Sequence, residues 1–188
     1  GERTITQTLE SILKQTVLPK LICVVDDGSM DGTLFILRAF FDKFPKRIRV
    51  ITLPDKGYDI RRVVHNFNIA IKEVERLGIK TKYTMVSADD CIYPSNYAEF
   101  LINKMEVNSR LVVTSGDIEN SPPDVTPRGS GRFLKNDFFK KIGNKYPPYY
   151  GYEGWILQKA LQLGYKIRNF TNLRYKHLRQ LGKKHKFS

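Results

Sequence analysis

Apolar residues recur along the chain in two patterns, one typical of helices and the other of buried strands. A stripe with helical spacing opens the chain and consists of Ile5, Leu9, Ile12 and Leu13. Further stripes predict helices over about 34–44, 60–77, 94–107, 135–142 and 152–163. Short runs of β-branched and other apolar residues predict strands over about 21–25, 47–53, 83–86, 111–115 and 166–170.

This alternation of strands and helices predicts an α/β fold. We expect a Rossmann-like sandwich, in which a mostly parallel central sheet carries helices on both faces. The length of 188 residues suits one domain. The polar segment 119–130 is dense in Pro and Gly, and it is where a division into two halves is expected.

Two carboxylates, Asp26 and Asp27, stand where the first predicted strand ends. In open α/β sheets, ligands bind at the carboxyl ends of the strands. The pair could accept hydrogen bonds from the N–H or hydroxyl groups of a nucleoside, and Gly28 would let the backbone come close. A calcium loop is a second interpretation, but its twelfth position is Arg38 where a bidentate Glu is needed. A helix-capping turn is a third, and it leaves both carboxylates unexplained.

A second pair of carboxylates, Asp89 and Asp90, follows the strand predicted over 83–86. Because both pairs stand at strand ends, we expect them to line one cleft. Carboxylate oxygens are the ligands that Mg²⁺ and Mn²⁺ prefer, and such ions often bind a carboxylate and a substrate phosphate together. A simpler interpretation also stays open, in which this pair caps the helix that begins near Pro94.

Glu153 begins a predicted helix inside the aromatic segment 149–155. The positive end of a helix dipole favours a carboxylate, which is a sufficient structural explanation. The aromatic neighbours could also stack on a sugar, so that Glu153 is a candidate general base. His177 follows the last predicted strand, and its neutral imidazole could complete a metal site, although a lone His is most often an ordinary residue.

The chain is strongly basic, with a formal charge of +13. The segment 165–188 holds eight Lys or Arg residues and no Asp or Glu. Such a block is most often a solvated face. It also suits a phosphate-rich ligand, a nucleic acid or an anionic membrane surface.

Cysteine content and hydropathy bear on the compartment. Cys23 and Cys91 offer neither a disulfide framework nor the spacing of a zinc site, so a reducing, cytoplasmic environment is expected. The sequence has no run of eighteen apolar residues and no signal-peptide pattern. The chain begins within a helical pattern and stops in a basic stretch, so we expect a domain truncated at both ends.

The order of these motifs resembles the inverting family 2 glycosyltransferases, whose fold is called GT-A, over nearly the whole chain. Residues 8–16 resemble the helix after the family's first strand, and Val-Val-Asp-Asp-Gly-Ser at 24–29 resembles its nucleoside-binding turn. His-Asn-Phe-Asn-Ile-Ala at 65–70 resembles its Ala-Arg-Asn-x-Gly-Ile helix. Ser-Ala-Asp-Asp at 87–90 resembles its Asp-x-Asp metal motif, with Ser in the first position. Tyr152-Glu153, a helix and Gly164-Tyr165 resemble the segment that carries the family's base.

The resemblance implies a transferase that moves a sugar from a nucleoside diphosphate sugar, such as a UDP- or GDP-sugar, to a hydroxyl of a sugar or lipid-linked acceptor. Residues 1–115 would bind the donor and 116–188 the acceptor. The implied donor contacts are Asp26, Asp27, Gly28, Ser29, Arg61, Arg62, His65, Asn66, Ala88 and Asp89. The implied ligands of Mn²⁺ or Mg²⁺ are Asp89, Asp90 and His177. Glu153 would be the catalytic base, with Tyr152 and Trp155 at the acceptor.

Other functions explain less of the sequence. A non-catalytic basic module for RNA or an anionic membrane surface would explain the charge but not two acidic pairs at strand ends. Phosphoryl transfer could use Asp26 or Asp27 as a nucleophile. A dinucleotide-binding oxidoreductase is disfavoured because no Gly-x-Gly-x-x-Gly follows a strand. We expect no nucleic acid partner, and the basic tail suggests peripheral association with the cytoplasmic membrane face.

Overall fold

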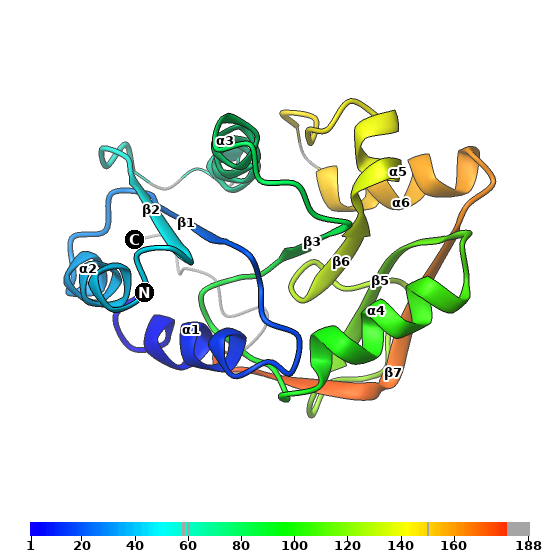
Figure 1. The fold of residues 1–188 in the computed structure, drawn as a ribbon, viewed down its shortest axis with the longest axis horizontal. Coiled ribbons are helices and arrows are strands. Elements are labelled where there is room, and N and C mark those ends of the chain that lie inside the picture. Colours follow the sequence, from blue (N-terminus) through cyan, green and yellow to red (C-terminus); the bar gives the residue numbers. More distant parts are fainter. Residues whose placement is uncertain (58, 60, 150, 180–188) are drawn as a thin grey trace.

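The computed structural model describes residues 1–57, 59, 61–149 and 151–179. Its strands form two sheets (Figure 1). The smaller sheet pairs β1 (Ile22–Asp26) in parallel with β2 (Ile48–Thr52). The larger sheet has the order β3-β6-β5-β7-β4. Its strands are β3 (Tyr83–Val86), β4 (Cys91–Ile92), β5 (Leu111–Ile118), β6 (Arg132–Lys135) and β7 (Lys166–His177).

The helices begin and end close to their predicted bounds. They are α1 (Ile5–Leu13), α2 (Thr33–Lys43), α3 (Arg61–Arg76), α4 (Tyr97–Val107), α5 (Asn136–Lys141) and α6 (Tyr152–Gln162). The predicted start of the third helix at residue 60 lies outside the described residues. Within the described ranges, no helix combines the length and the apolar character that crossing a bilayer requires.

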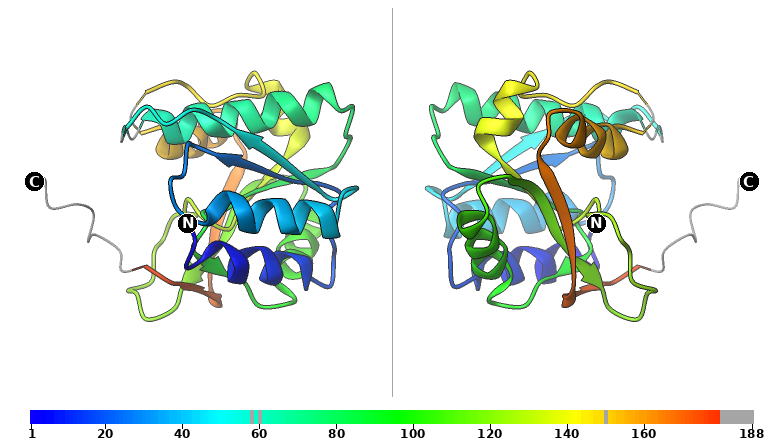
Figure 2. Two further views of the ribbon diagram at one scale, coloured as in Figure 1. Left: turned by 90° about the vertical axis from the view of Figure 1, so that its left-hand side faces the viewer. Right: turned by 90° about the vertical axis from the view of Figure 1, so that its right-hand side faces the viewer.

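The smaller sheet lies between helices, with α3 on one face and α1 and α2 on the other (Figures 1 and 2). Alternate residues of β1, Ile22 and Val24, pack on the α1–α2 side against Leu9 and Leu37. Leu9 and Leu37 are almost fully buried. This packing fixes the direction of β1, and therefore the place where its last residue, Asp26, ends the strand.

The larger sheet is also covered on both faces. On one face, Leu101 and Met105 of α4 pack against Phe133 of β6. On the other face, Leu134 of β6 packs with residues of α5 and α6, among them Ile156. Phe133 and Leu134 are neighbours that enter different cores, as the alternation of side chains along a strand requires.

The predicted mostly parallel sheet is wrong for the larger sheet, which is mixed. Strands β3 and β6, β5 and β6, and β4 and β7 pair antiparallel, and β5 and β7 pair parallel. A parallel return needs a crossover, usually a helix, whereas an antiparallel return needs only a loop. The segment 119–131 between β5 and β6 contains no helix, so β6 returns antiparallel beside β5.

The strands β4 and β6 were not predicted, and β7 continues to His177, beyond the predicted end at residue 170. Strand β4 has only two residues, and β6 carries Arg and Lys at its ends, so neither gives an apolar run. In the added part of β7, buried Leu173 and Tyr175 alternate with polar residues. That alternation is the signal that identifies a strand there.

Candidate functional site

Asp26 is the last residue of β1, and its side chain is buried without a partner. The residue is 4% exposed. Neither carboxylate oxygen has a hydrogen-bond partner among the residues that the structure describes. The backbone of Asp26 is fixed, because the N–H of Leu53 donates to its carbonyl at 2.8 Å. Buried carboxylates are nearly always hydrogen-bonded, so this one has capacity for a ligand that donates.

Asp27 points instead to α3. The Nε of Arg62 donates to its Oδ2 at 2.7 Å, and Nη2 of Arg62 contacts the other oxygen. The hydrogen bond from Arg62 is the main reason why the pKa of Asp27 lies below its usual value, and Asn66 also lowers it. The ionised carboxylate of Asp27 therefore binds the start of α3 through Arg62. The adjacent carboxylates have different environments, which the sequence did not distinguish.

Gly28 allows this turn to touch the loop after β2. Its φ of 77° lies in the left-handed region, and an added Cβ would stand 2.3 Å from the backbone N of Asp55. Both the conformation and the contact therefore require glycine. Ser29 follows as a partly buried residue.

The residues of α3 that were predicted to bind the sugar donor have different surroundings in the structure. Arg62 joins Asp27, and Asn66 lies beside it with a buried Oδ1 that has no partner within the described ranges. Arg61 turns away to Asp59, with 2.7 Å between Nη2 and Oδ2, and its side chain is 71% exposed. His65 is exposed, and it is the smallest of the influences that lower the pKa of Asp27.

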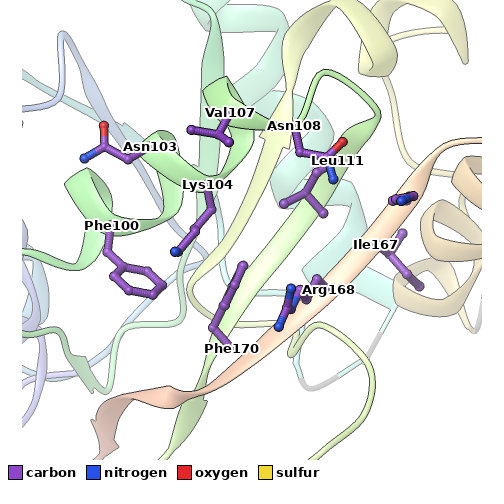
Figure 3. A pocket seen from close by; sticks show the side chains of 10 residues that line it. Phe100, Asn103, Lys104, Val107, Asn108, Leu111, Ile167, Arg168 and Phe170 are labelled. Atoms are coloured by element: carbon purple, nitrogen blue, oxygen red, sulfur yellow. The ribbon is translucent and has the colours of Figure 1, made fainter.

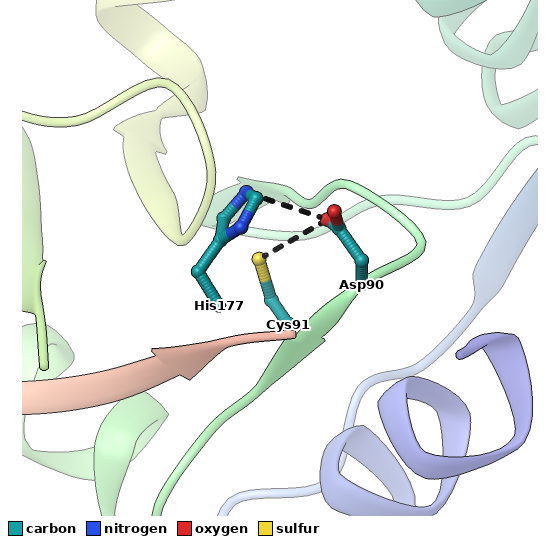
Figure 4. Close-up of side chains that lie close together, drawn as sticks. All are labelled: Asp90, Cys91 and His177. Atoms are coloured by element: carbon teal, nitrogen blue, oxygen red, sulfur yellow. Dashed lines mark hydrogen bonds and ion pairs between the residues drawn. The ribbon is translucent and has the colours of Figure 1, made fainter. Parts of the chain in front are cut away.

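Asp90, Cys91 and His177 form a compact cluster (Figure 4). Cys91 of β4 and His177 of β7 are partners across the antiparallel ladder. His177 Nε2 lies 3.5 Å from Asp90 Oδ1, and Cys91 Sγ lies 3.8 Å from the same oxygen. One ligand atom from each residue lies within 4.8 Å of the others. The structure thus brings together the predicted metal ligands Asp90 and His177, and it adds Cys91.

Asp89 is linked to Asp90 through Arg179. The Nη2 of Arg179 donates to Asp89 Oδ2, and its Nε lies 3.6 Å from Asp90 Oδ2. The side chain of Asp90 is 6% exposed and that of Asp89 is 39% exposed. Ala88 precedes them and packs against the α4 core. Arg179 was not predicted as a site residue; its signal in the sequence is a cation two residues after the candidate ligand His177.

The two acidic turns approach each other at Gly1. The amino group of Gly1 lies 3.0 Å from Asp31, which follows the Asp27 turn. A Cβ on Gly1 would lie 3.2 Å from Asp89 Oδ2 and 2.9 Å from the hydroxyl of Thr33. The turn after β1 and the turn after β3 are therefore neighbours on one side of the molecule.

Glu153 occupies the first turn of α6, as predicted, and is exposed. A Cβ on Gly129 would lie 2.1 Å from its Oε1, so the carboxylate lies directly against the loop that precedes β6. Arg132, which is 3% exposed, holds these elements together. Its guanidinium donates to the carbonyls of Glu153, Arg128 and Pro127 at 2.8–3.1 Å. Arg132 was not predicted as a site residue, because an arginine in a short unpredicted strand gives no sign of burial.

The aromatic residues beside Glu153 belong to the core. Tyr152 packs against Tyr146, with 5.7 Å between ring centroids, and against Phe67 at 6.1 Å. Burial is the main cause that raises the pKa of Tyr152 well above its usual range. Trp155 is partly buried in the same cluster. Both predicted acceptor residues therefore have structural contacts that explain their aromatic character.

Three packed tyrosines support both the acidic turn and the loop against Glu153. The ring centroids of Tyr93, Tyr97 and Tyr175 lie 4.8–5.8 Å apart. The hydroxyl of Tyr93 lies 2.8 Å from Ser87 Oγ. Those of Tyr97 and Tyr175 donate to the carbonyls of Gly131 and Ser130 at 2.8 and 2.9 Å. We name Tyr93, Tyr97 and Tyr175 the tyrosine cluster.

The loop 119–131 is also tied to the end of β5. The buried carboxylate of Asp117 accepts from Arg128 Nε at 2.7 Å and lies 3.5 Å from Arg174 Nη1. The hydrogen bond from Arg128 is the strongest influence that lowers the pKa of Asp117, against the effect of its burial. The loop, which contains the segment where a division into two halves was expected, is thus fixed to β5 by ion pairs.

A cavity of about 530 Å³ lies away from these residues, between α4 and β7 (Figure 3). Its lining includes Phe100, Lys104, Arg168 and Phe170. Arg168 lies over the Phe170 ring at 4.8 Å, and Lys104 over the Phe100 ring at 5.2 Å. None of the predicted site residues lines this cavity.

Comparisons with known proteins identify the family of the chain. The model of the family described as glycosyl transferase family 2 matches residues 1–162. The chain is 42% identical to chondroitin synthase of Escherichia coli over 53 residues, which are 28% of this chain and 8% of that protein.

Solved structures share the fold over nearly the whole chain. The mannosyltransferase PcManGT from Pyrobaculum calidifontis, in complex with GDP-Man and Mn²⁺, has a TM-score of 0.71 at 17% identity, over 95% of this chain and 54% of that chain. S. aureus TarS 1-349, in complex with UDP-GlcNAc, has a TM-score of 0.69 at 17% identity, over 97% of this chain and 56% of that chain. The chain therefore spans about half the length of these structures.

Proposed function

The chain belongs to glycosyl transferase family 2, and on this premise we propose that it carries the donor-binding and catalytic residues of an inverting, nucleotide-sugar-dependent glycosyltransferase. The donor is a nucleoside diphosphate sugar, and the acceptor presents a hydroxyl group. The observation that carries the proposal is the buried Asp26 carboxylate, which has no partner among the described residues at a strand end beside a second acidic turn.

Asp26 supports recognition of a nucleoside. A buried carboxylate that lacks hydrogen bonds is costly, and a base or ribose that donates N–H or O–H groups would satisfy it. Asn66 Oδ1 is also buried and has no hydrogen-bond partner among the described residues. Asp27 takes a positioning role in this proposal, because its carboxylate already binds Arg62. Among the similar structures, PcManGT was solved with GDP-Man and TarS with UDP-GlcNAc.

The cluster around Asp90 has donors that fit Mn²⁺ or Mg²⁺. Asp90 and Asp89 offer carboxylate oxygens, His177 offers an imidazole nitrogen, and the guanidinium of Arg179 already occupies this place as a cation. These ions prefer oxygen to sulfur, so we do not assign the Cys91 thiol as a ligand. When bound, the ion would neutralise charge on the leaving nucleoside diphosphate.

Glu153 is the proposed general base. Its carboxylate is exposed, and it lies against a loop that Arg132 ties to the start of α6. A base must be fixed in place and reachable by the acceptor hydroxyl, and the bound backbone and exposed side chain of Glu153 support this role. Removal of the hydroxyl proton by Glu153 would let the oxygen attack the anomeric carbon from the face opposite the leaving group, with inversion of configuration.

Thermal unfolding with a panel of nucleoside diphosphates, with and without Mn²⁺, tests the proposal. At about 100 times its Kd, one diphosphate should raise Tm by roughly 5 °C or more when Mn²⁺ is present. The free nucleoside should raise Tm less, because it lacks the phosphates. Equal unfolding temperatures under all these conditions would contradict the proposal.

A further inference from the structure

Arg179 places a single cation on two adjacent carboxylates. Its guanidinium bonds to Asp89, lies 3.6 Å from Asp90 Oδ2 and donates to the hydroxyl of Thr4 at 3.1 Å. The side chain is 52% exposed and extends from the residues just after β7. Its own carbonyl lies 2.6 Å from His177 Nδ1, so Arg179 is tied to the third candidate metal ligand as well.

This arrangement balances the charge of the acidic pair without a metal. Two ionised carboxylates next to each other repel, and a guanidinium that contacts both relieves the repulsion. A divalent cation on Asp89 and Asp90 would need the same carboxylate oxygens. Its positive charge would also repel a guanidinium that stayed in place.

We propose that Arg179 is an exchangeable counter-ion, which holds Asp89 and Asp90 before the metal binds and then moves to the diphosphate of the donor. This inference rests on the proposed function. An arginine suits both positions, because its planar fork binds carboxylates and phosphates alike. The half-exposed side chain can rotate without opening the core.

The exchange makes the metal and the diphosphate bind cooperatively. A metal that binds alone must displace Arg179 from the carboxylates and leaves the guanidinium without an anionic partner. When a diphosphate is bound beside the metal, the displaced guanidinium gains a new anion. Arg179 therefore weakens the binding of metal alone and strengthens the binding of diphosphate in the presence of metal.

Mn²⁺ affinity in the absence of nucleotide tests the first half of the inference. The free Mn²⁺ signal in electron paramagnetic resonance gives the Kd for the wild-type chain, R179M and R76M. R179M should bind Mn²⁺ about threefold or more tightly than wild type, since an exposed ion pair no longer competes. R76M is the matched control, because Arg76 pairs with Glu73 on α3 and should leave the Mn²⁺ affinity unchanged. Equal or weaker Mn²⁺ binding by R179M, or no binding by either chain at millimolar Mn²⁺, overturns the inference.

Diphosphate affinity at saturating Mn²⁺ tests the second half. R179M should bind the diphosphate at least about fivefold more weakly than wild type, while R179K retains part of the affinity. Unchanged diphosphate affinity in R179M overturns the transfer of Arg179 to the donor. If wild type binds no diphosphate at all, the proposed function fails. The comparison without nucleotide still decides whether Arg179 competes with the metal.

Discussion

Cys91 and His177 face each other across the two-residue ladder between β4 and β7, and this pairing places His177 beside Asp90. The long last strand thus returns to the acidic turn that follows β3. Asp90 and His177 are far apart in sequence, and the fold brings them within 3.5 Å of each other. The same return places Arg179 on the two carboxylates.

E153Q should lower the rate of transfer by about 100- to 10,000-fold, because an amide cannot accept the proton of the acceptor hydroxyl. Binding of the nucleoside diphosphate should be unchanged in this variant. Transfer assays and thermal shift measure the two properties separately. E10Q serves as the control, because among the described residues the Glu10 carboxylate pairs with Lys14 alone, at the surface of α1. Full transfer activity in E153Q would remove Glu153 from the role of base.

D26N should weaken binding of the nucleoside diphosphate by roughly tenfold or more, since hydrogen bonds to a charged acceptor contribute about 1.5–3 kcal/mol. In the absence of nucleotide the variant should be as stable as wild type or more stable, because it loses a buried charge that has no partner among the described residues. Calorimetric titration and thermal unfolding measure these two effects. If D26N lowers stability and leaves the affinity unchanged, Asp26 has a structural role only.

G28A should destabilise the chain by about 1–3 kcal/mol and weaken nucleotide binding. The added Cβ would meet the backbone of Asp55 in a left-handed conformation. G57A is a matched control, because Gly57 has a similar φ of 73° and open space around it. G57A should therefore lower the free energy of unfolding less than G28A does, because it has only the cost of the left-handed conformation. Equal losses of this free energy in the two variants, measured by chemical denaturation, would contradict the close contact at Gly28.

R132M should lower the free energy of unfolding by about 2–5 kcal/mol, because three carbonyls lose their buried donor. The position of Glu153 depends on the same contacts, so transfer should fall together with stability. K14M, at an exposed position, should change stability by less than about 0.5 kcal/mol. A stable R132M variant would show that the loop before β6 is held by other contacts.

Stability should depend on pH through Glu73, which joins α3 to β2. Arg76 first, and Arg49 after it, lower the pKa of Glu73 from 4.5 to about 2. A lowered pKa means that the ion pairs stabilise the fold above pH 4.5 and that this contribution is lost as the pH falls toward 2. E73Q should therefore be less stable than wild type at pH 7, and the difference should shrink below pH 4.5. A constant difference across this range would contradict the ion-pair explanation.

Local patterns were sufficient to predict the helices and the strands with long apolar runs. The bounds of β3, Tyr83–Val86, were predicted to the residue, because the run of strand-forming residues ends at Ser87. Strands β4 and β6 could not be predicted in this way. Their residues become strands only through pairing with distant segments, β7 in one case and β3 and β5 in the other. The mixed topology follows from those pairings.

The candidate site was also predicted only in part. Asp26, Asp90 and Glu153 were visible in the sequence, because each stands where a strand ends or a helix begins. Their environments were not visible. The partner of Asp27 is an arginine on α3, and the cation on Asp89 comes from the residues after β7. Such contacts depend on tertiary packing, which no local pattern encodes.

The tyrosine cluster connects two segments of the candidate site that are far apart in the sequence. The hydroxyl groups of its three tyrosines form hydrogen bonds with Ser87 on one side and with the backbone carbonyls of Ser130 and Gly131 on the other. The tyrosine cluster thus joins the turn that leads to Asp89 and Asp90 to the loop that lies against Glu153. If the metal site and the base lie where we propose, residues buried far from solvent fix the distance between them, and exposed residues of either loop can change without altering it.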